Sequence, residues 1–267
     1  MTTSLFQYTE GQAPLLISMP HNGTQIPDDI AACMTDIGLT VPDTDWCIDR
    51  LYDFADAVGA YVIKPTNSRL VIDLNRDPTG VNLYPGAQST ELCPTTCFDF
   101  SPVYKSGHLP DEQEINRRIE QYWHPYHQQL QQALADIRER FGVAVLLDAH
   151  SIRSEVARFF DGRLPDFNFG TATGKSCSQV LQEHLQQFDT KPYSQVGNGR
   201  FKGGYITRAY GDPDNNIHAV QLELSQRTYM DEANADYDER LAAQVKPVLR
   251  KFVEHLLTFA EQDKGAL

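Results

Sequence analysis

The sequence lacks the features that would place a protein in or across a membrane. It contains no run of about 18 consecutive apolar residues, the length needed to cross a bilayer as a helix. Its first residues have neither the basic start nor the apolar core of a secretion signal. We therefore expect a cytoplasmic protein with no membrane partner.

Cysteine is scarce and odd in number, which argues against a disulfide framework. The chain has five cysteines and no visible secretion signal, so we expect reduced thiols. Cys93 and Cys97 form one CxxxC pair without a second pair. Because a structural zinc site usually needs four ligands, this pair alone does not predict one.

Basic residues are few relative to acidic ones. The chain has 23 Lys and Arg against 36 Asp and Glu, which gives a formal net charge of −13. This balance excludes a nucleic-acid partner, because phosphate binding needs a basic surface. If the substrate is an anion, the protein must concentrate arginine inside its site.

Several common catalytic motifs are also missing. Ser151 follows His150, but no G-x-S-x-G segment is present, so a nucleophilic serine is not indicated. The chain has no phosphate-binding loop of the Walker type and no G-x-G-x-x-G after a strand pattern. These absences remove the commonest nucleotide-using enzymes.

What the sequence does contain is the pattern of one α/β domain. With 267 residues, 41% hydrophobic and 22% charged, it can bury a substantial core. Short apolar runs alternate with longer helical patterns, which is typical of α/β proteins. Thr44 or Asp45 is a candidate N-cap, and long loops are expected at 78–110 and 193–217. The patterns predict strands at 15–19, 60–63, 69–74, 143–148 and 219–224, and helices at 44–58, 111–141, 175–188 and 233–262.

Chemically active residues follow or end three of the predicted strands. His21 follows the first, His150 follows the fourth, and Glu223 lies at the end of the fifth. Because ligands bind at the carboxyl ends of parallel strands, these groups are expected to meet at one edge. Two histidines supply two of the roughly three protein ligands that a catalytic zinc needs. The third ligand would be a carboxylate from Asp43, Asp45 or Asp49.

Each of these residues also has an ordinary structural interpretation. A single histidine after a strand is commonly a hydrogen-bonded turn residue, and an aspartate at a helix start is usually a cap. His124 and His127 form a rival pair, three residues apart in a helical stretch. Pro125 and the aromatic neighbours favour packing for that pair.

Six segments, in order along the chain, resemble the N-formylglutamate amidohydrolase (deformylase) family. The family is related to zinc carboxypeptidases and to the aspartoacylase group, and it shares the Asp-x-Asn-Arg element with the latter. The matching segments are Ser18-Met-Pro-His-Asn-Gly, Thr44-Asp-Trp with Asp49-Arg-Leu-Tyr, Ser68-Arg-Leu-Val-Ile-Asp-Leu-Asn-Arg-Asp-Pro, Leu147-Asp-Ala-His-Ser, Gly203-Gly-Tyr-Ile-Thr-Arg-Ala-Tyr-Gly and Gln221-Leu-Glu-Leu-Ser-Gln.

The resemblance implies a single zinc-carboxypeptidase-like α/β domain, with a central mixed sheet flanked by helices and one zinc ion. His21 and His150 would be ligands. The relatives' carboxylate three residues after the first histidine is replaced here by Thr24, which cannot take that role. Asp45 is therefore the expected third ligand, with Asp49 in reserve.

The resemblance further implies hydrolysis of N-formyl-L-glutamate to glutamate and formate, the last step of a histidine degradation route. Glu223, in an otherwise apolar strand, suits a general base because burial would raise its pKa; the alternative is a solvent-facing strand-edge glutamate. Asn75 and Arg76 would hold the α-carboxylate, Arg69 the developing oxyanion, and Arg208 the side-chain carboxylate.

Some alternatives stay open. Instead of a catalytic role, each of these arginines could form a salt bridge, for example to Asp73 or Asp77, and this alternative is strongest for Arg69. The enzyme alternatives are a deacylase of another N-acyl acidic amino acid and a small zinc carboxypeptidase, which would use the same chemistry with a different pocket. A binding protein on a decayed hydrolase scaffold is disfavoured because the proposed ligands and Glu223 are all present.

Overall fold

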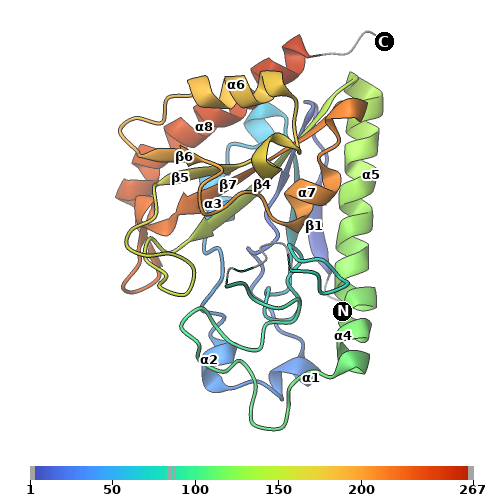
Figure 1. Ribbon diagram of the computed structural model, residues 1–267, viewed down its shortest axis with the longest axis vertical. Helices are drawn as coiled ribbons and strands as arrows, with labels where there is room; N and C mark the ends of the chain where they lie inside the picture. Colours follow the sequence, from blue (N-terminus) through green and yellow to red (C-terminus); the bar gives the residue numbers. More distant parts are fainter. Residues whose placement is uncertain (1–3, 83–85, 87, 264–267) are drawn as a thin grey trace.

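A seven-stranded mixed sheet forms the centre of the molecule (Figure 1). The computed structural model describes residues 4–82, 86 and 88–263. The strand order is β1-β3-β2-β4-β7-β5-β6, and a separate two-stranded ribbon pairs β8 with β9. The strands are β1 (Phe6–Thr9), β2 (Leu15–Ser18), β3 (Tyr61–Pro65), β4 (Ala144–Ile152), β5 (Phe167–Gly170), β6 (Gln195–Gly197), β7 (Ile217–Ser225), β8 (Met230–Asp231) and β9 (Asp236–Tyr237).

Four neighbouring strands, β3, β2, β4 and β7, run parallel to one another. Strand β1 pairs antiparallel with β3, and β5 pairs antiparallel with β7. The expected mixed sheet is therefore confirmed. Because the four central strands are parallel, their carboxyl ends lie along the same edge, where side chains from distant parts of the chain can meet.

Helices cover both faces of the sheet (Figure 1). Strand residues alternate between two hydrophobic clusters, as the twofold period of a strand requires. Leu147 belongs to the cluster that contains residues of α3, α6 and α8, whereas Leu146 belongs to the one that contains residues of α5 and α7. The helices are α1 (Asp28–Ala31), α2 (Asp36–Leu39), α3 (Ile48–Leu51), α4 (Glu112–Arg118), α5 (His124–Phe141), α6 (Gln179–Gln187), α7 (Tyr205–Tyr210) and α8 (Glu239–Gln262).

The strand predictions are confirmed in four places and wrong in one. Strands β2, β3, β4 and β7 form where the runs 15–19, 60–63, 143–148 and 219–224 predicted them. The run 69–74 forms turns and loop instead of a strand. Its apolar side chains, including Leu70 and Ile72, are buried in the core while the backbone turns, with Val71 N donating to Ser68 O at 2.9 Å. An apolar run alone does not distinguish a buried loop from a buried strand.

The predicted helix 44–58 is wrong as a continuous element. Cys47 has a left-handed backbone (φ 57°), so only α3 and a short 3₁₀ turn (Asp56–Val58) form there. Neither proposed N-cap caps a helix: Thr44 Oγ1 donates to Val41 O, and the Asp45 side chain turns toward the sheet. The loop 193–217 also proves to contain β6 and α7.

The other three helix predictions are confirmed with later starts or an interruption. The region 111–141 forms α4 and α5, joined by a π-helical turn at Ile119–Trp123. Helix α6 begins after its N-cap Ser178, and α8 begins after its N-cap Asp238. In both cases the cap oxygen accepts backbone N–H groups of the first turn, which fixes the start of the helix.

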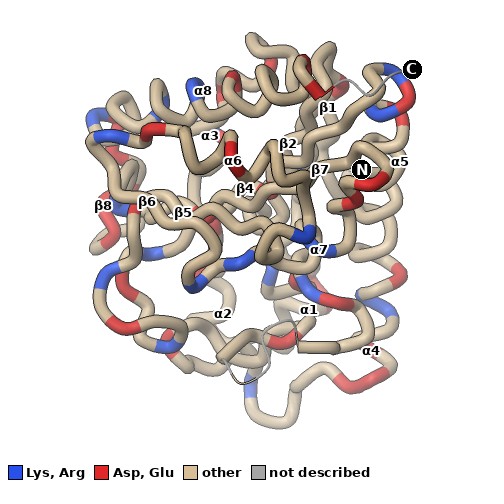
Figure 2. The backbone as a smooth tube through the Cα atoms, turned by 45° about the horizontal axis from the view of Figure 1, so that its top comes forward, with Lys and Arg blue, Asp and Glu red and all other residues tan. Residues whose placement is uncertain are grey.

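Charged residues lie mainly on helices and loops around the sheet, and the central strands carry few (Figure 2). All five cysteines are free thiols, as expected, and Cys93 and Cys97 are buried. Among the described residues, no helix is both long and apolar enough to cross a membrane.

Candidate metal centre and substrate cavity

Strands β4 and β7 place four polar side chains on one face of the sheet. Asp148 is paired in register with Gln221, and His150 with Glu223. Residues two apart in a strand point to the same face, and so do in-register neighbours of a parallel pair. All four side chains are buried. The chain thus brings two carboxylates, an amide and an imidazole together at the carboxyl end of the sheet.

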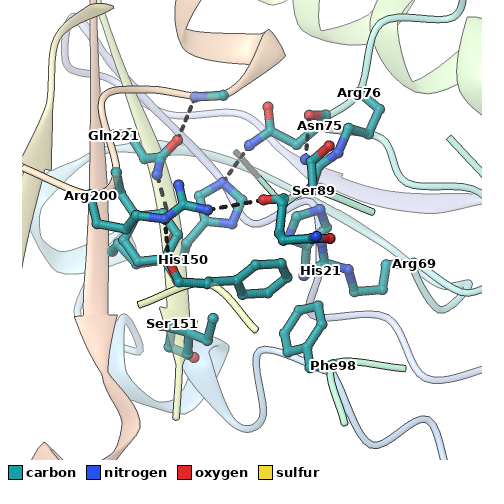
Figure 3. A pocket seen from close by; sticks show the side chains of 16 residues that line it. His21, Arg69, Asn75, Arg76, Ser89, Phe98, His150, Ser151, Arg200 and Gln221 are labelled. Carbon is teal, nitrogen blue, oxygen red and sulfur yellow. Dashed lines mark hydrogen bonds between the residues drawn. The ribbon is translucent and has the colours of Figure 1, made fainter. Parts of the chain in front are cut away.

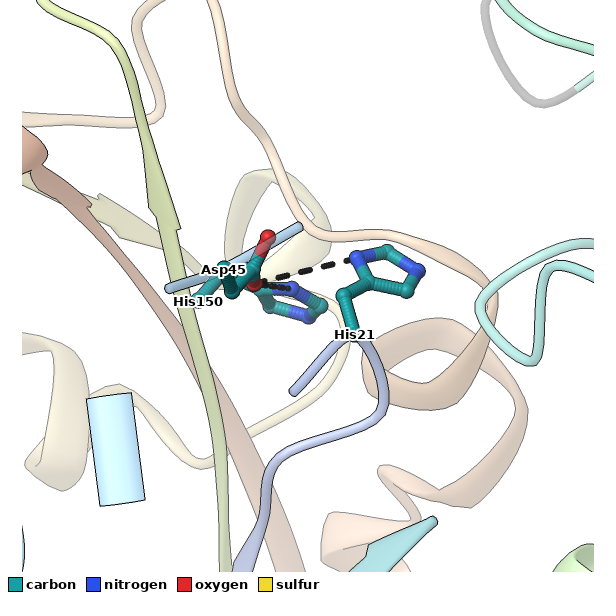
Figure 4. A group of neighbouring side chains, drawn as sticks. All are labelled: His21, Asp45 and His150. Carbon is teal, nitrogen blue, oxygen red and sulfur yellow. Dashed lines mark hydrogen bonds and ion pairs between the residues drawn. The ribbon is translucent and has the colours of Figure 1, made fainter. Parts of the chain in front are cut away.

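Two other segments complete the cluster. His21 follows β2, and Asp45 lies in the connection before α3, where its backbone N donates to His21 O at 3.1 Å. The ligand-type atoms of His21, Asp45 and His150 all lie within 4.8 Å of one another. Figure 4 shows a nitrogen of each imidazole facing the carboxylate of Asp45. No other group of this kind occurs in the described part of the chain.

Each histidine has one nitrogen toward Asp45 and the other toward a different carboxylate. Nδ1 of His21 lies 3.8 Å, and Nδ1 of His150 3.1 Å, from Asp45 Oδ2. Nε2 of His21 lies 2.7 Å from Asp73 Oδ1. Nε2 of His150 lies 3.0 Å from Asp148 Oδ1, an oxygen that has no hydrogen-bond partner among the described residues. Carboxylates behind the imidazoles are the usual outer partners of metal-ligating histidines, because they hold the proton on the far nitrogen.

The cluster also needs positive charge. Asp45, Asp73 and Asp148 are almost fully buried; Arg69 lies 4.0 Å from Asp45 and 2.6 Å from Asp73, and Arg76 lies 3.7 Å from Asp73. Burial of a carboxylate is costly unless a cation compensates it. Burial would raise the pKa of Asp45, but the hydrogen bond and charge of His150, with those of His21 and Arg69, hold it below its usual value. A divalent ion among the three ligand-type side chains would supply charge where the protein lacks it, so the donor set fits such an ion.

The two imidazoles differ in their proton affinity. Burial, reinforced by the Arg69 charge, lowers the pKa of His21 despite the carboxylates of Asp73 and Asp45. Burial alone would lower the pKa of His150 too, but the Asp148 and Asp45 carboxylates raise it well above its usual value. A positive charge is therefore favoured next to Asp45, whether a proton or a metal ion carries it.

The other two candidate carboxylates lie elsewhere. Asp49 Oδ2 pairs with Lys64 Nζ at 2.6 Å, and its Oδ1 accepts from Asn22 at 3.4 Å. Asp43 Oδ2 accepts from the backbone N of Phe98 at 2.9 Å. Of the three aspartates that the sequence left open, the structure groups only Asp45 with the two histidines.

Glu223 is 7% exposed and does not face solvent as a strand-edge glutamate would. Burial raises its pKa to about 8, with the Asp45 charge adding to the shift and the charges of His150 and Arg69 opposing it. Gln221 Nε2 donates to Glu223 Oε2 at 3.4 Å. The side chain lines the same cavity as the two histidines, so its carboxyl can exchange a proton with a group bound there.

Three arginines line the cavity: Arg69, Arg76 and Arg200. Figure 3 shows Arg200 on the opposite side from Arg69 and Arg76. Arg69 Nη2 lies 2.6 Å from Asp73 Oδ2, so the salt bridge weighed from the sequence is present even though the residue also faces the cavity. Three arginines thus meet at one cavity in a protein whose formal net charge is −13. The other lining residues are His21, Asn75, Gln88, Ser89, Phe98, His150, Ser151, Ile152, Phe159, Phe201, Gly204, Gln221 and Glu223.

The structure does not place Arg208 and Asn75 as expected for residues that hold the carboxylates of a substrate. Arg208 is exposed, its Nε donates to Gly203 O at 2.8 Å, and it is not among the described residues that line the cavity. Asn75 lines the cavity, but its Oδ1 accepts from Ile206 N, and its Nδ2 lies 3.2 Å from Asp148 Oδ2 and 2.9 Å from His150 Nε2. Its amide therefore joins α7 to the cluster.

The sequence interpretation missed Arg200 and the two aspartates behind the histidines. Arg200 lies in the long loop expected at 193–217, but the Gly-rich segment 203–211, which resembles the family, directed the prediction to Arg208. Asp148 could have been found, because it is two residues before His150 in a strand and must share its face. His124 and His127 have the expected structural role. The His127 ring is stacked on Trp123 with 3.6 Å between ring centroids, and His124 Nε2 lies 3.5 Å from Glu120 Oε1.

The chain is similar over most of its length to known proteins. The model of the N-formylglutamate amidohydrolase family matches residues 13–230. A Pseudomonas putida protein named N-formylglutamate deformylase is 48% identical over 261 residues, which cover 97% of each chain. A Pseudomonas aeruginosa protein of the same name is 46% identical over 261 residues, covering 97% of this chain and 98% of the relative.

Solved structures show the same architecture. The crystal structure of an N-formylglutamate amidohydrolase from Ralstonia eutropha matches with a TM-score of 0.81 and 25% identity, covering 97% of this chain and 99% of that one. A gene product from Agrobacterium tumefaciens matches with a TM-score of 0.69 at 16% identity, over 95% of this chain and 96% of that one. This second similarity shows the fold alone.

The grouping of Asp45 with two histidines predicts a selective loss of metal affinity. Asp45→Asn removes the charge between the imidazoles, and we expect it to weaken zinc binding by more than about 100-fold, since even outer partners of metal ligands contribute about 10- to 100-fold. Asp49→Asn is the matched control and should change zinc affinity little. Competition with a chromophoric chelator measures both. Equal losses in the two variants would contradict the assignment.

Proposed function

Because this chain belongs to the N-formylglutamate amidohydrolase family, we propose that it hydrolyses N-formyl-L-glutamate to L-glutamate and formate. The observation that carries the proposal is the convergence of a metal-type triad, a buried glutamate and three arginines on one cavity. The substrate is a dianion with one hydrolysable amide, and this set of groups matches both properties. The triad and the general base supply the chemistry, and the arginines supply the charge recognition.

We assign the metal position to His21, Asp45 and His150. A zinc ion held there would lower the pKa of a water molecule to about 7 and polarise the formyl carbonyl. Asp73 would keep the far nitrogen of His21 protonated, so that its Nδ1 is free to bind the ion. Asp148 lies 3.0 Å from Nε2 of His150 and would accept a proton held there once the ion occupies Nδ1.

Glu223 is the proposed general base. It takes the proton of the attacking water and then gives it to the departing amine nitrogen, which becomes the α-amino group of glutamate. A pKa of about 8 lies close to neutral pH, so both the proton acceptance and the proton return are accessible. The placement of Glu223 beside His150 in the parallel β4–β7 pair puts it next to the metal position.

Arg69 is the proposed oxyanion partner. Its Nη1 lies 4.0 Å from Asp45 Oδ1, so the guanidinium borders the metal position. The ion pair with Asp73 fixes the guanidinium before substrate arrives, which is the condition for stabilising a developing negative charge without reorganisation.

Arg76 and Arg200 are the proposed anchors for the two carboxylates. Arg76 is held by Thr90, through Nε to its carbonyl at 3.1 Å and Nη2 to Oγ1 at 3.0 Å. Arg200 donates to Phe159 O at 2.6 Å and to Gln88 O at 3.1 Å. Their places on opposite sides of the cavity suit a substrate with a carboxylate at each end of a short chain. Arg200 thus takes the role that the sequence had given to Arg208.

The proposed function is tested by formate release from N-formyl-L-glutamate by purified protein. We expect activity that is lost after chelation and restored by zinc, because the ion is needed to activate water. Formate is measured enzymatically in untreated, chelated and zinc-restored samples. A folded, zinc-loaded sample that releases no formate would refute the proposal.

Glu223→Gln separates proton transfer from metal binding. The variant keeps the size of the side chain and removes its basicity, so kcat should fall by about 100- to 10,000-fold. Zinc content should stay unchanged, because Glu223 is not one of the three grouped ligands. Single-turnover assays with parallel metal analysis measure both quantities. Near-normal kcat in the zinc-loaded variant would rule out the general-base role.

Arg200→Gln tests the recognition of the second carboxylate. We expect kcat/KM for N-formyl-L-glutamate to fall by at least about 10-fold relative to N-formyl-L-glutamine, because a charged hydrogen bond contributes about 1.5–3 kcal/mol. Arg208→Gln serves as the control, since that side chain does not line the cavity among the described residues. The assignment fails if the two variants change the preference equally.

A further inference from the structure

A second cleft lies beside the substrate cavity, and Phe98 borders both. The two spaces share Phe98, Ser151 and Ile152. The substrate cavity has a volume of about 70 Å³, whereas the second cleft has about 530 Å³. Only the shared residues Phe98, Ser151 and Ile152 therefore separate the small substrate cavity from a cleft of much larger volume.

Phe98 stands on the side of the cavity where the chemistry takes place. Its ring centroid lies 5.1 Å from the guanidinium carbon of Arg69, the proposed oxyanion partner. On another side, the Phe98 ring meets Phe159 edge-on, with 4.9 Å between centroids. The ring therefore closes the cavity next to the place where a carbonyl oxygen would be held.

The arrangement of the charged anchors sets the direction of the acyl group. In Figure 3, Arg76 lies beyond the two histidines from Phe98 and Ser151, and Arg200 lies to the side, next to His150. A substrate whose carboxylates face these two arginines leaves the side of Phe98 for the substituent on its acyl carbon. In a formyl group this substituent is a hydrogen, and in a longer acyl group it is a carbon chain.

The segment that carries Phe98 is held from two directions. Phe98 N donates to Asp43 Oδ2 at 2.9 Å. Arg158 Nη1 donates to Thr96 Oγ1 at 2.9 Å and to Cys97 O at 2.8 Å. A ring on a backbone fixed in this way cannot retreat easily from a larger acyl group, so it acts as a rigid wall.

We propose that Phe98 restricts the enzyme to the formyl group, and that the cleft behind it becomes an acyl-binding pocket when the ring is removed. This inference rests on the proposed hydrolysis of N-formyl-L-glutamate. The second cleft suits an alkyl chain on the side formed by Trp46, Phe100 and Val156. The reaction is unchanged: water adds to the acyl carbon, the C–N bond breaks, and the carboxylic acid and glutamate leave.

The test compares kcat/KM for N-formyl-, N-acetyl- and N-butanoyl-L-glutamate in the zinc-loaded wild-type enzyme and in Phe98→Ala. We expect the acetyl-to-formyl ratio to rise by at least about 10-fold in the variant, since one methylene changes discrimination by about 10- to 200-fold. The butanoyl-to-formyl ratio should rise as well. Comparing ratios between enzymes cancels the higher intrinsic reactivity of formamides.

Two further variants make the comparison decisive. Leu109→Ala is the control, because Leu109 is 63% exposed and lines neither the substrate cavity nor the second cleft; its ratios should match those of the wild type. Phe98→Leu retains a smaller apolar side chain, and we expect a smaller rise in the same ratios. If Phe98→Ala does not fold, this variant shows whether Phe98 limits the size of the acyl group.

The possible failures are distinguishable. Unchanged ratios in folded Phe98 variants that still release formate would overturn the inference and leave the proposed function intact. A wild-type enzyme that cleaves N-acetyl-L-glutamate as efficiently as the formyl substrate would overturn it as well. A wild-type enzyme that releases no formate at all would refute the proposed function itself and the inference with it.

Discussion

The carboxylate of Asp45 between two buried imidazoles is the interaction on which the rest of this structure depends. His21, Asp45 and His150 come from three distant parts of the chain, and the parallel strands β2 and β4 deliver the two histidines to the same edge of the sheet. The break at Cys47 then allows Asp45 to turn inward rather than cap a helix. Its side chain also accepts from Ser151 N at 3.1 Å, which ties it to the end of β4.

Charge balance explains why other groups surround this triad. Buried carboxylates behind both histidines would be costly without cations; Arg69 supplies one, and the proposed metal ion would supply further positive charge. The same need accounts for arginines gathered at one cavity in a chain whose formal net charge is −13. In the proposed function, the ion would lie at His21, Asp45 and His150, and Arg76 and Arg200 would give the cavity the positive charge that a dianionic substrate requires.

The sequence predicted the groups that lie in regular strands better than those that lie in loops. His150 and Glu223 could be placed because strand ends and twofold alternation fix where such residues point. Asp73 lies in the run 69–74 that we expected as a strand, and Arg76 follows it; their contacts depend on a turn that the pattern does not encode. Arg208 lies in helix α7 and in the family-like segment 203–211, whereas Arg200 lies just before it, and only the packing of this region decides which one borders the cavity.

The most direct test of this account is a crystal structure of the zinc-loaded protein, with anomalous diffraction recorded at the zinc absorption edge. We expect one strong anomalous peak bounded by Nδ1 of His21, Nδ1 of His150 and the Asp45 carboxylate, with Asp73 and Asp148 still in contact with the far imidazole nitrogens. A zinc-saturated crystal with its peak at other residues, or with no peak at this position, would contradict the account.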